Sequence, residues 1–350
     1  MKKIIFTYEG YSNTNIGDYI QSLAAKQFIN NEEDILYCHR DELNSHHVDY
    51  AKVVMNGWFT HKPENWPPSD KVTPLFVAFH INSSVYHQLL SKESISYLKR
   101  YEPIGCRDEA TAQLLKRKGV DAYFSSCLTT TLGYKYKNPE AVRNKIYIVD
   151  PVHYVPEASS RFKKYLFIFY YLRYCKGITR FIKSLKNNNV YNLRINKKNI
   201  TRYLSIIRSY IILRQILSSK ELEDAIVLTQ YHYAEEYPTN EERFARAEEL
   251  IKMYSTAKLV ITSRIHCALP CLGLETPVIF LKNLDDSQDS HCRFQGLLSL
   301  MNVISFKKNK IIETPLQLPL LSADVSVKKE YNIFANKLIN KVQSFFSSQK

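Results

Sequence analysis

The sequence predicts an α/β protein with two units, each built around a parallel β-sheet. Short apolar runs alternate with segments of helical periodicity along most of the chain, which is the pattern of strand–helix–strand repeats. A length of 350 residues suits two such units, and a composition of 45% apolar and 23% charged residues is ordinary for a globular protein. We expect a first unit over residues 1–135, a polar linker near 133–144, a second unit over 145–325, and a helix within 326–350 that crosses back to the first unit.

The first half opens with a strand over residues 3–8 and a polar loop over 9–18 that contains two glycines. The loop lacks the GxGxxG spacing of a dinucleotide site. Asp18 stands where an amphipathic helix begins, and it is interpreted either as a helix cap or as a ligand-binding residue. The other elements expected in this half are strands over 34–38, 52–55, 74–79, 103–106 and 122–125, and helices over 84–100 and 107–118.

The second half shows the same alternation and carries a basic insertion. Strands are expected over 145–149, 225–230, 259–261 and 277–280, and helices over 241–254, 264–272, 295–301 and 327–346. Between the first two of these strands, residues 158–220 contain 15 lysines or arginines and no aspartate or glutamate. The rest of the chain carries 33 basic against 34 acidic residues, so the formal charge of +14 belongs to this insertion.

An apolar run of eight residues, 165–172, lies inside the insertion and is flanked by cations. Eight residues cannot span a bilayer, but an aromatic, basic helix can lie in a membrane interface. We therefore expect peripheral contact with an anionic membrane. Two alternatives stay open: helices that pack on the second unit with a solvated basic face, and a nucleic-acid partner, for which the sequence has no recognised motif.

The cysteines and the N-terminus indicate the compartment. Seven cysteines form no zinc-like pairs, and no cluster of His, Cys and carboxylates has the spacing of metal ligands, so we expect free thiols and no metal. The first residues have only a three-residue apolar core, which suits a strand and not a signal peptide. No stretch approaches the ~20 apolar residues of a membrane span. We expect a bacterial-type cytoplasmic protein, peripheral at the inner membrane face.

The strongest functional signal follows the predicted strand over 259–261. Ser263 and the residue before it are good helix-capping candidates, so Arg264 and His266 fall in the first turn of a helix. Ligands bind at the carboxyl ends of strands in open α/β sheets, and helix N-termini favour anions. Arg107 has the same placement after the strand over 103–106. Two arginines, one in each half, are thus predicted to face each other across a cleft that binds a phosphate or a carboxylate.

Three motifs in order resemble the polysaccharide pyruvyl transferases. They are Asn15-Ile-Gly-Asp18, Gly105-Cys-Arg-Asp-Glu-Ala-Thr111, and Ser263-Arg-Ile-His266 followed by Gly273 and Pro277-Val-Ile, and the likeness covers roughly residues 10–300. The resemblance implies a GT-B-like pair of facing Rossmann-type domains. It also implies phosphoenolpyruvate as donor co-substrate without a cofactor, and a hydroxyl pair of a capsule or exopolysaccharide sugar, or of its lipid-linked precursor, as acceptor.

The same resemblance assigns the donor site to Arg107, Ser263, Arg264, Ile265 and His266. A guanidinium pairs bidentately with a carboxylate or a phosphate, which suits the two arginines to hold the donor. His266 is a candidate general acid or phosphate partner, and Asp18 a candidate base or sugar ligand. The candidate catalytic residues are therefore Asp18, Arg264 and His266.

Four residues on the predicted rim of strand ends are expected to touch the acceptor sugar: Asn15, Asn56, Trp58 and His80. Trp58 is included because an aromatic ring can stack on a sugar. The candidates of the donor site each keep a structural alternative. Arg107 would make a surface ion pair with its acidic neighbours, Arg264 would be purely structural, and His266 would be a satisfied core histidine.

Two other functions stay open. The first is a GT-B glycosyltransferase that uses a nucleotide-activated sugar in polysaccharide biosynthesis, with Glu275 as the carboxylate that binds the ribose. The second is a non-catalytic protein that binds glycans or acts as a scaffold. Arg293 is too isolated in the sequence to be assigned to any of these functions.

Overall fold

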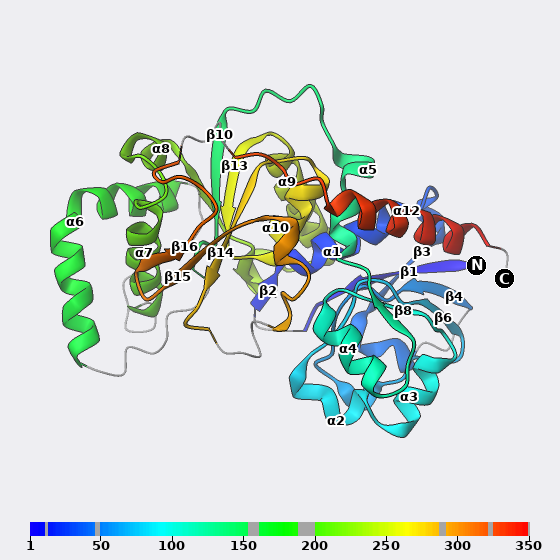
Figure 1. Ribbon diagram of the computed structural model, residues 1–350. Coiled ribbons are helices and arrows are strands. Elements are labelled where there is room, and N and C mark those ends of the chain that lie inside the picture. The colour runs from blue at the N-terminus through cyan, green and yellow to red at the C-terminus, as the bar shows by residue number, and fades with distance from the viewer. Residues whose placement is uncertain are drawn as a thin grey trace.

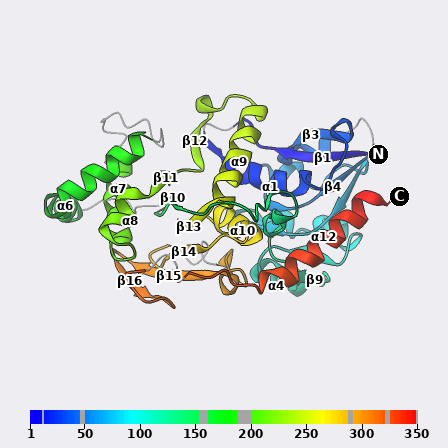
Figure 2. The ribbon, with the colours of Figure 1, turned by 90° about the horizontal axis from the view of Figure 1, so that it is seen from above.

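The structure, a computed structural model, describes residues 1–10, 13–45, 50–152, 161–187, 200–286, 292–320 and 325–348. It confirms an α/β protein with several parallel sheets (Figure 1). The sheets of the N-terminal half lie on one side of the molecule, and the large sheet of the C-terminal half lies on the other (Figures 1 and 2).

The N-terminal half contains two four-stranded parallel sheets. The first has the order β3-β1-β4-β6, with the bounds β1 Lys2–Thr7, β3 Ile35–His39, β4 Ala51–Val54 and β6 Val72–Leu75. The second has the order β5-β7-β8-β9, with the bounds β5 Gly57–Phe59, β7 Phe79–Ile81, β8 Ile104–Cys106 and β9 Ala122–Phe124. The single sheet expected for this half is therefore wrong.

The chain passes from the first of these sheets to the second at two tight turns. Gly57 follows β4 with a φ of 123°, a conformation that glycine adopts without strain, and Ala78 follows β6 with a φ of 55°. The strand predicted over 74–79 is split by the second turn, because β6 ends at Leu75 and β7 begins at Phe79. Every residue from Phe76 to Phe79 is buried. Because the apolar run is unbroken, the sequence pattern gives no sign of this turn.

Five helices accompany these two sheets within the described residues. They are α1 Ile16–Lys26, α2 Tyr86–Leu89, α3 Lys92–Lys99, α4 Glu109–Arg117 and α5 Gly133–Tyr136. The helix predicted over 84–100 is interrupted, because the Ser91 hydroxyl accepts the N–H of Ser94 and starts α3 anew. In α4 the cap is Asp108, whose carboxylate accepts the N–H of Thr111 at 2.9 Å. The expected linker near 133–144 contains α5.

A six-stranded sheet organises the C-terminal half, in the order β11-β10-β13-β14-β15-β16. Its bounds are β10 Lys145–Val149, β11 Ile226–Leu228, β13 Ala257–Thr262, β14 Val278–Asn283, β15 Asn302–Lys307 and β16 Lys310–Glu313. All neighbours are parallel except β15 and β16. Its helices include α8 Ser219–Asp224, α9 Asn240–Ser255 and α10 Ile265–Gly273. The helix predicted over 295–301 is only the 3-10 turn Leu298–Leu300, after Gly296 with a φ of 82°.

The basic insertion between β10 and β11 contains two helices, α6 Arg161–Asn187 and α7 Ile200–Leu213. Both views place α6 at the edge of the molecule, beyond α7 (Figures 1 and 2). Within the part of the chain that the structure describes, no helix is long and apolar enough to cross a membrane.

The two halves share one continuous apolar core that contains residues of α1, α9 and α10. A short antiparallel pair also joins them, formed by β2 Asn13–Asn15 and β12 Tyr231–Tyr233. At Gly273 in α10, an added Cβ would lie 2.5 Å from the carbonyl oxygen of Thr130, so this glycine lets the helix pack directly on backbone of the N-terminal half. The halves therefore hold a fixed relation around the space between them.

The C-terminal helix α12, Tyr331–Ser347, runs along the N-terminal half (Figure 1). Lys52 in β4 donates to the carbonyl oxygen of Phe345 at 2.7 Å, and Lys341 donates to the hydroxyl of Tyr123 in β9 at 2.8 Å. Phe334 packs edge-on against Phe124 with ring centroids 5.1 Å apart. These contacts tie the end of the chain to its first half.

Candidate active site

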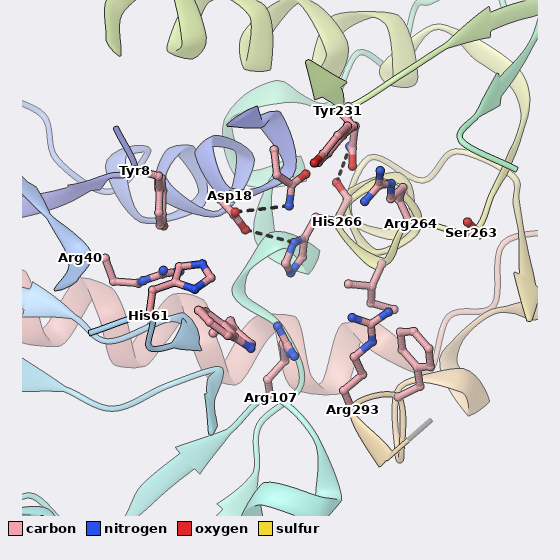
Figure 3. Close-up of a pocket in the computed structure, with 15 residues that line it drawn as sticks. Tyr8, Asp18, Arg40, His61, Arg107, Tyr231, Ser263, Arg264, His266 and Arg293 are labelled. Atoms are coloured by element: carbon pink, nitrogen blue, oxygen red, sulfur yellow. Dashed lines mark hydrogen bonds and ion pairs between the residues drawn. The ribbon is translucent and has the colours of Figure 1, made fainter. Parts of the chain in front are cut away.

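A cavity of about 440 Å³ lies between the two halves. Its walls come from the first turns of α1 and α10, the loops after β3 and β8, the segment around β12, and the residues before the Leu298–Leu300 turn. Figure 3 shows the labelled side chains of these elements around one space. Arg107 and Arg264, one from each half, both line this cavity, as the placement of the two arginines after their strands predicts.

The N-termini of α1 and α10 meet at this cavity. A Cβ at Gly17 would lie 3.0 Å from the Cβ of His266, so the first turns of the two helices are in close contact. Asn15 caps α1 by accepting the N–H of Gly17 at 3.2 Å, which leaves Asp18 in the first turn and not at the cap. The cap position of α10 is Arg264, which provides no side-chain cap. Helix N-termini attract anions, and two of them are combined here.

Each half contributes one arginine that is held by a carboxylate. Arg264 donates from Nε to Asp150 at 3.0 Å, and Arg40, just after β3, donates from Nε to Asp41 at 3.1 Å. Asp150 also accepts the Gln230 N–H at 3.0 Å. Such contacts fix the plane of a guanidinium, and both arginines line the cavity.

Two other arginines carry buried nitrogens without a protein partner. The Nε atoms of Arg107 and Arg293 are buried, and neither has a hydrogen-bond partner among the described residues. Asp108 lies 3.8 Å from the Nε of Arg107, beyond hydrogen-bond range. Burial, followed by the charge of Arg107, lowers the pKa of Arg293 to about 10. Buried donors without partners are costly, which indicates that an anionic ligand completes this site.

His266 and Asp18 lie together between these cations. The Nδ1 of His266 is 3.9 Å from Oδ1 of Asp18, and its Nε2 is buried without a partner among the described residues (Figure 3). Burial and then the charges of Arg107 and Arg293 hold the pKa of His266 well below its usual range, so the ring is neutral. Desolvation raises the pKa of Asp18, against the opposing charge of Arg40. Burial therefore favours the neutral form of both side chains.

An aromatic wall closes the cavity on the side of the N-terminal half. The Arg40 guanidinium lies 5.1 Å from the ring centre of Tyr8 and 5.0 Å from that of Trp58. The rings of Trp58 and His61 have centroids 4.3 Å apart. Tyr231, opposite and 39% exposed, lies beside the Arg264 guanidinium at 5.7 Å. Aromatic faces next to cations provide a surface for a sugar ring as well as charge for an anion.

Most of the candidate site residues line this one cavity: Asn15, Asp18, Trp58, Arg107, Ser263, Arg264, Ile265 and His266. Two do not. Asn56 is buried and donates to the carbonyl oxygen of Gln21 at 2.9 Å, and His80 is buried with Nδ1 2.6 Å from Asp108. The ion pair considered for Arg107 does form with Asp108, at 3.8 Å, but it is buried and not at the surface, because Arg107 is only 3% exposed.

The cavity also contains residues that the sequence did not single out: Tyr8, Arg40, His61, Gln230, Tyr231, Arg293 and Phe294. A signal for Arg40 did exist, because it directly follows β3 as Arg107 follows β8. The same signal existed for Tyr231, which directly follows the strand predicted over 225–230. Arg293 follows no such rule and reaches the cavity only through the packing of the C-terminal half.

The fold and the site define an α/β protein with a cationic cleft between its two halves. The chain belongs to the polysaccharide pyruvyl transferase family, whose model matches residues 15–286. Membership implies that the protein is a transferase that acts in polysaccharide metabolism. A search of curated proteins found no match to this chain.

Proposed function

We propose that the protein transfers the pyruvyl group of phosphoenolpyruvate to two hydroxyls of one sugar, in a surface glycan or its lipid-linked precursor on the cytoplasmic side. We further propose that its halves form a GT-B-like pair, with the donor held mainly by the C-terminal half. One observation carries the proposal: Arg107, Arg293 and His266 line one cavity, and each has a buried nitrogen without a hydrogen-bond partner among the described residues.

Donor binding needs cations from both halves. Phosphoenolpyruvate carries a carboxylate and a phosphate, and the cavity offers Arg107 from one half and Arg264 and Arg293 from the other. The first turn of α10 adds backbone N–H groups to the same space. Because these groups are held away from water, their attraction for an anion is stronger than that of exposed cations. The donor thus bridges the two halves.

The reaction has two additions at C2 of the donor. In the first, C3 gains a proton and a sugar hydroxyl oxygen bonds to C2, with its own proton passing to a base. In the second, the bond between C2 and the phosphate oxygen breaks, phosphate leaves, and the second hydroxyl bonds to C2 and loses its proton. The sum is one cyclic ketal and one hydrogen phosphate, with protons and charge balanced. The arginines that bind the donor also stabilise the leaving phosphate.

His266 and Asp18 are the residues that transfer protons in this proposal. The ring of His266 is neutral in the empty cleft because burial and the arginines lower its pKa. A bound phosphate opposes that effect, raises the pKa and lets the ring take up the proton that C3 requires. Asp18, 3.9 Å from the ring, is placed to accept the proton of the first hydroxyl. Trp58 and Tyr8 provide the wall on which the acceptor sugar stacks.

The nucleotide-sugar alternative rests on Glu275, and the structure places this residue elsewhere. Glu275 follows the carboxyl end of α10, whereas Arg264 and His266 stand at its amino end. Its carboxylate pairs with Lys137 at 2.8 Å and with Lys329 at 3.2 Å. Glu275 therefore does not supply a ribose-binding carboxylate to the cavity. We prefer the pyruvyl transfer proposal for this reason.

Thermal unfolding with phosphoenolpyruvate tests the proposal. A ligand at 100 times its Kd stabilises the native state by about 2.7 kcal/mol, so phosphoenolpyruvate should raise the Tm. Arg264→Ala should abolish the rise, while Lys258→Ala, in the preceding strand, should retain it. Release of phosphate that depends on an added glycan would then establish turnover. A Tm that responds to a nucleoside diphosphate and not to phosphoenolpyruvate would contradict the proposal.

A further inference from the structure

Among the α6 side chains that the structure describes, several apolar ones pack on the rest of the protein. Ile178 is fully buried and Phe181 is 5% exposed, and both lie in apolar clusters of the insertion and the C-terminal sheet. The guanidinium of Arg214, just after α7, lies 4.1 Å from the ring centre of Tyr174. The inner side of α6 is therefore packed against the protein, and this packing fixes which side chains of the helix point to solvent.

The opposite side presents large apolar side chains to solvent. Ile168, Phe169, Tyr171 and Leu172 are 53%, 57%, 40% and 68% exposed, within five consecutive residues. In the rest of the described chain, exposed large apolar side chains are separated along the sequence, apart from Tyr231, which lines the cleft, and Tyr233. Single exposed apolar residues are normal, whereas a contiguous patch marks a surface that contacts something.

Cations continue this surface along the same helix. Arg173, Lys176 and Lys183 are exposed, and none of them pairs with an acidic side chain among the described residues. Arg180 differs, because it forms an ion pair with Glu223. We call the four apolar residues and these three exposed cations the outer face of α6. The Nε of Arg173 also donates to the Tyr174 hydroxyl at 3.0 Å. Residues 158–220 contain no aspartate or glutamate at all, so the charge of this region has a single sign.

We propose that the outer face of α6 docks on an anionic lipid surface and holds the enzyme at a membrane. Aromatic and aliphatic side chains enter the boundary between headgroups and acyl chains, and the neighbouring cations bind anionic headgroups. Nucleic acid would satisfy the cations but leave Ile168 and Leu172 exposed. A second copy of the chain would bring two faces of the same charge together, which is repulsive.

The position of α6 suits this docking. It lies at the edge of the molecule, at the opposite end from α12 (Figures 1 and 2). Contact there leaves the cleft between the halves uncovered. The inference goes beyond the proposed reaction, and it holds or fails independently of what the cleft binds.

Binding to vesicles tests it with two triple variants. Phosphatidylcholine vesicles with and without phosphatidylglycerol are compared for the wild type, for Arg173→Gln/Lys176→Gln/Lys183→Gln and for Ile168→Ser/Phe169→Ser/Leu172→Ser. Each cation contributes up to about tenfold to the affinity for an anionic surface, so the charge variant should bind anionic vesicles roughly 100-fold more weakly. The apolar variant should lose at least about tenfold, because its side chains no longer enter the interface.

A matched variant and two further measurements make the result decisive. Lys92→Gln/Lys116→Gln/Lys118→Gln removes the same charge from exposed positions of α3, α4 and the residue after α4, and it should bind within about twofold of the wild type. Thermal unfolding without ligand checks that each variant is folded. Equal loss in this control, unchanged binding of the apolar variant, or a dimer that the apolar substitutions dissociate in light scattering would each overturn the proposal. Binding to duplex DNA in place of vesicles would do the same.

Discussion

The cleft and the outer face of α6 are both cationic, but the cations of the cleft are largely buried and those of α6 are exposed to solvent. In the cleft, Arg107 is 3% exposed, and burial followed by the charge of Arg107 lowers the pKa values of His266 and Arg293. On α6, Arg173, Lys176 and Lys183 are exposed, and the distinctive feature is apolar surface beside the charge. The insertion carries the net charge of the chain, whereas most of the candidate site residues line the cleft. Burial and orientation, more than the number of cations, therefore identify a site for a small anion.

The largest expected difference between the two regions is their response to an exchange of arginine for lysine. Arg107→Lys keeps the charge in the cleft but loses the planar fork, so kcat/KM should fall by at least about 100-fold. Arg173→Lys on α6 should change vesicle binding by less than about twofold, because an exposed membrane contact depends on charge. Arg117→Lys, exposed at the end of α4, controls for the first substitution. Equal tolerance at positions 107 and 173 would remove the distinction drawn between the two regions.

The two regions also contain matched ion pairs, one buried and one exposed. Arg264 and Asp150 are 13% and 5% exposed, whereas Arg180 and Glu223 are 65% and 46% exposed. Asp150→Asn removes the carboxylate charge from a buried ion pair and should lower the free energy of unfolding by about 3 kcal/mol, measured by urea denaturation. Asn tolerates the φ of 41° at this position, so backbone strain does not add to the loss.

The exposed pair provides the comparison for that experiment. Glu223→Gln should cost less than about 0.5 kcal/mol, because water and salt screen the pair. Both variants are measured under the same conditions, with the midpoint and slope of the urea transition determined separately. If Asp150→Asn unfolds no more readily than Glu223→Gln, the pair at Arg264 is less desolvated than the structure indicates.

The smallest expected effect is a change in pH dependence at His266. Its pKa lies well below 6.5, so below about pH 6.5 the unfolded chain binds a proton that the native state does not, and stability falls as the pH falls. Phosphoenolpyruvate, the proposed donor, should raise this pKa on binding, so its binding should take up a proton and tighten from pH 8 to pH 6. Relative to His266→Gln, the gain in affinity should be about tenfold by calorimetry.

A second histidine separates this effect from the ligand's own titration. His87→Gln, at an exposed position of α2, should show the same pH profile as the wild type. The titration of phosphoenolpyruvate itself contributes equally to all three proteins and cancels in the comparison. Parallel profiles for the wild type and His266→Gln would show that this ring gains no proton when the donor binds.

The alternation of strands and helices, and the placement of Arg107, Arg264 and His266 beyond strand ends, could be predicted because both follow from local rules. Apolar runs mark buried strands, and the carboxyl ends of parallel strands meet at one edge. The same rule applied to β3 would have found Arg40. It misled at His80, which follows the predicted strand over 74–79 but lies inside β7 and bonds to Asp108.

By itself, the sequence determined the α/β class, the family, the segment that carries the net charge and the motif residues of the cleft, because each of these is written in short stretches of chain. Only the tertiary structure decided that the N-terminal half has two sheets, that Arg293 and Tyr8 join the cleft, and that apolar residues of α6 face solvent. It also decided that His266 is neutral. The physical reason is that burial and electrostatic environment depend on contacts between residues far apart in the chain, and no local pattern records them.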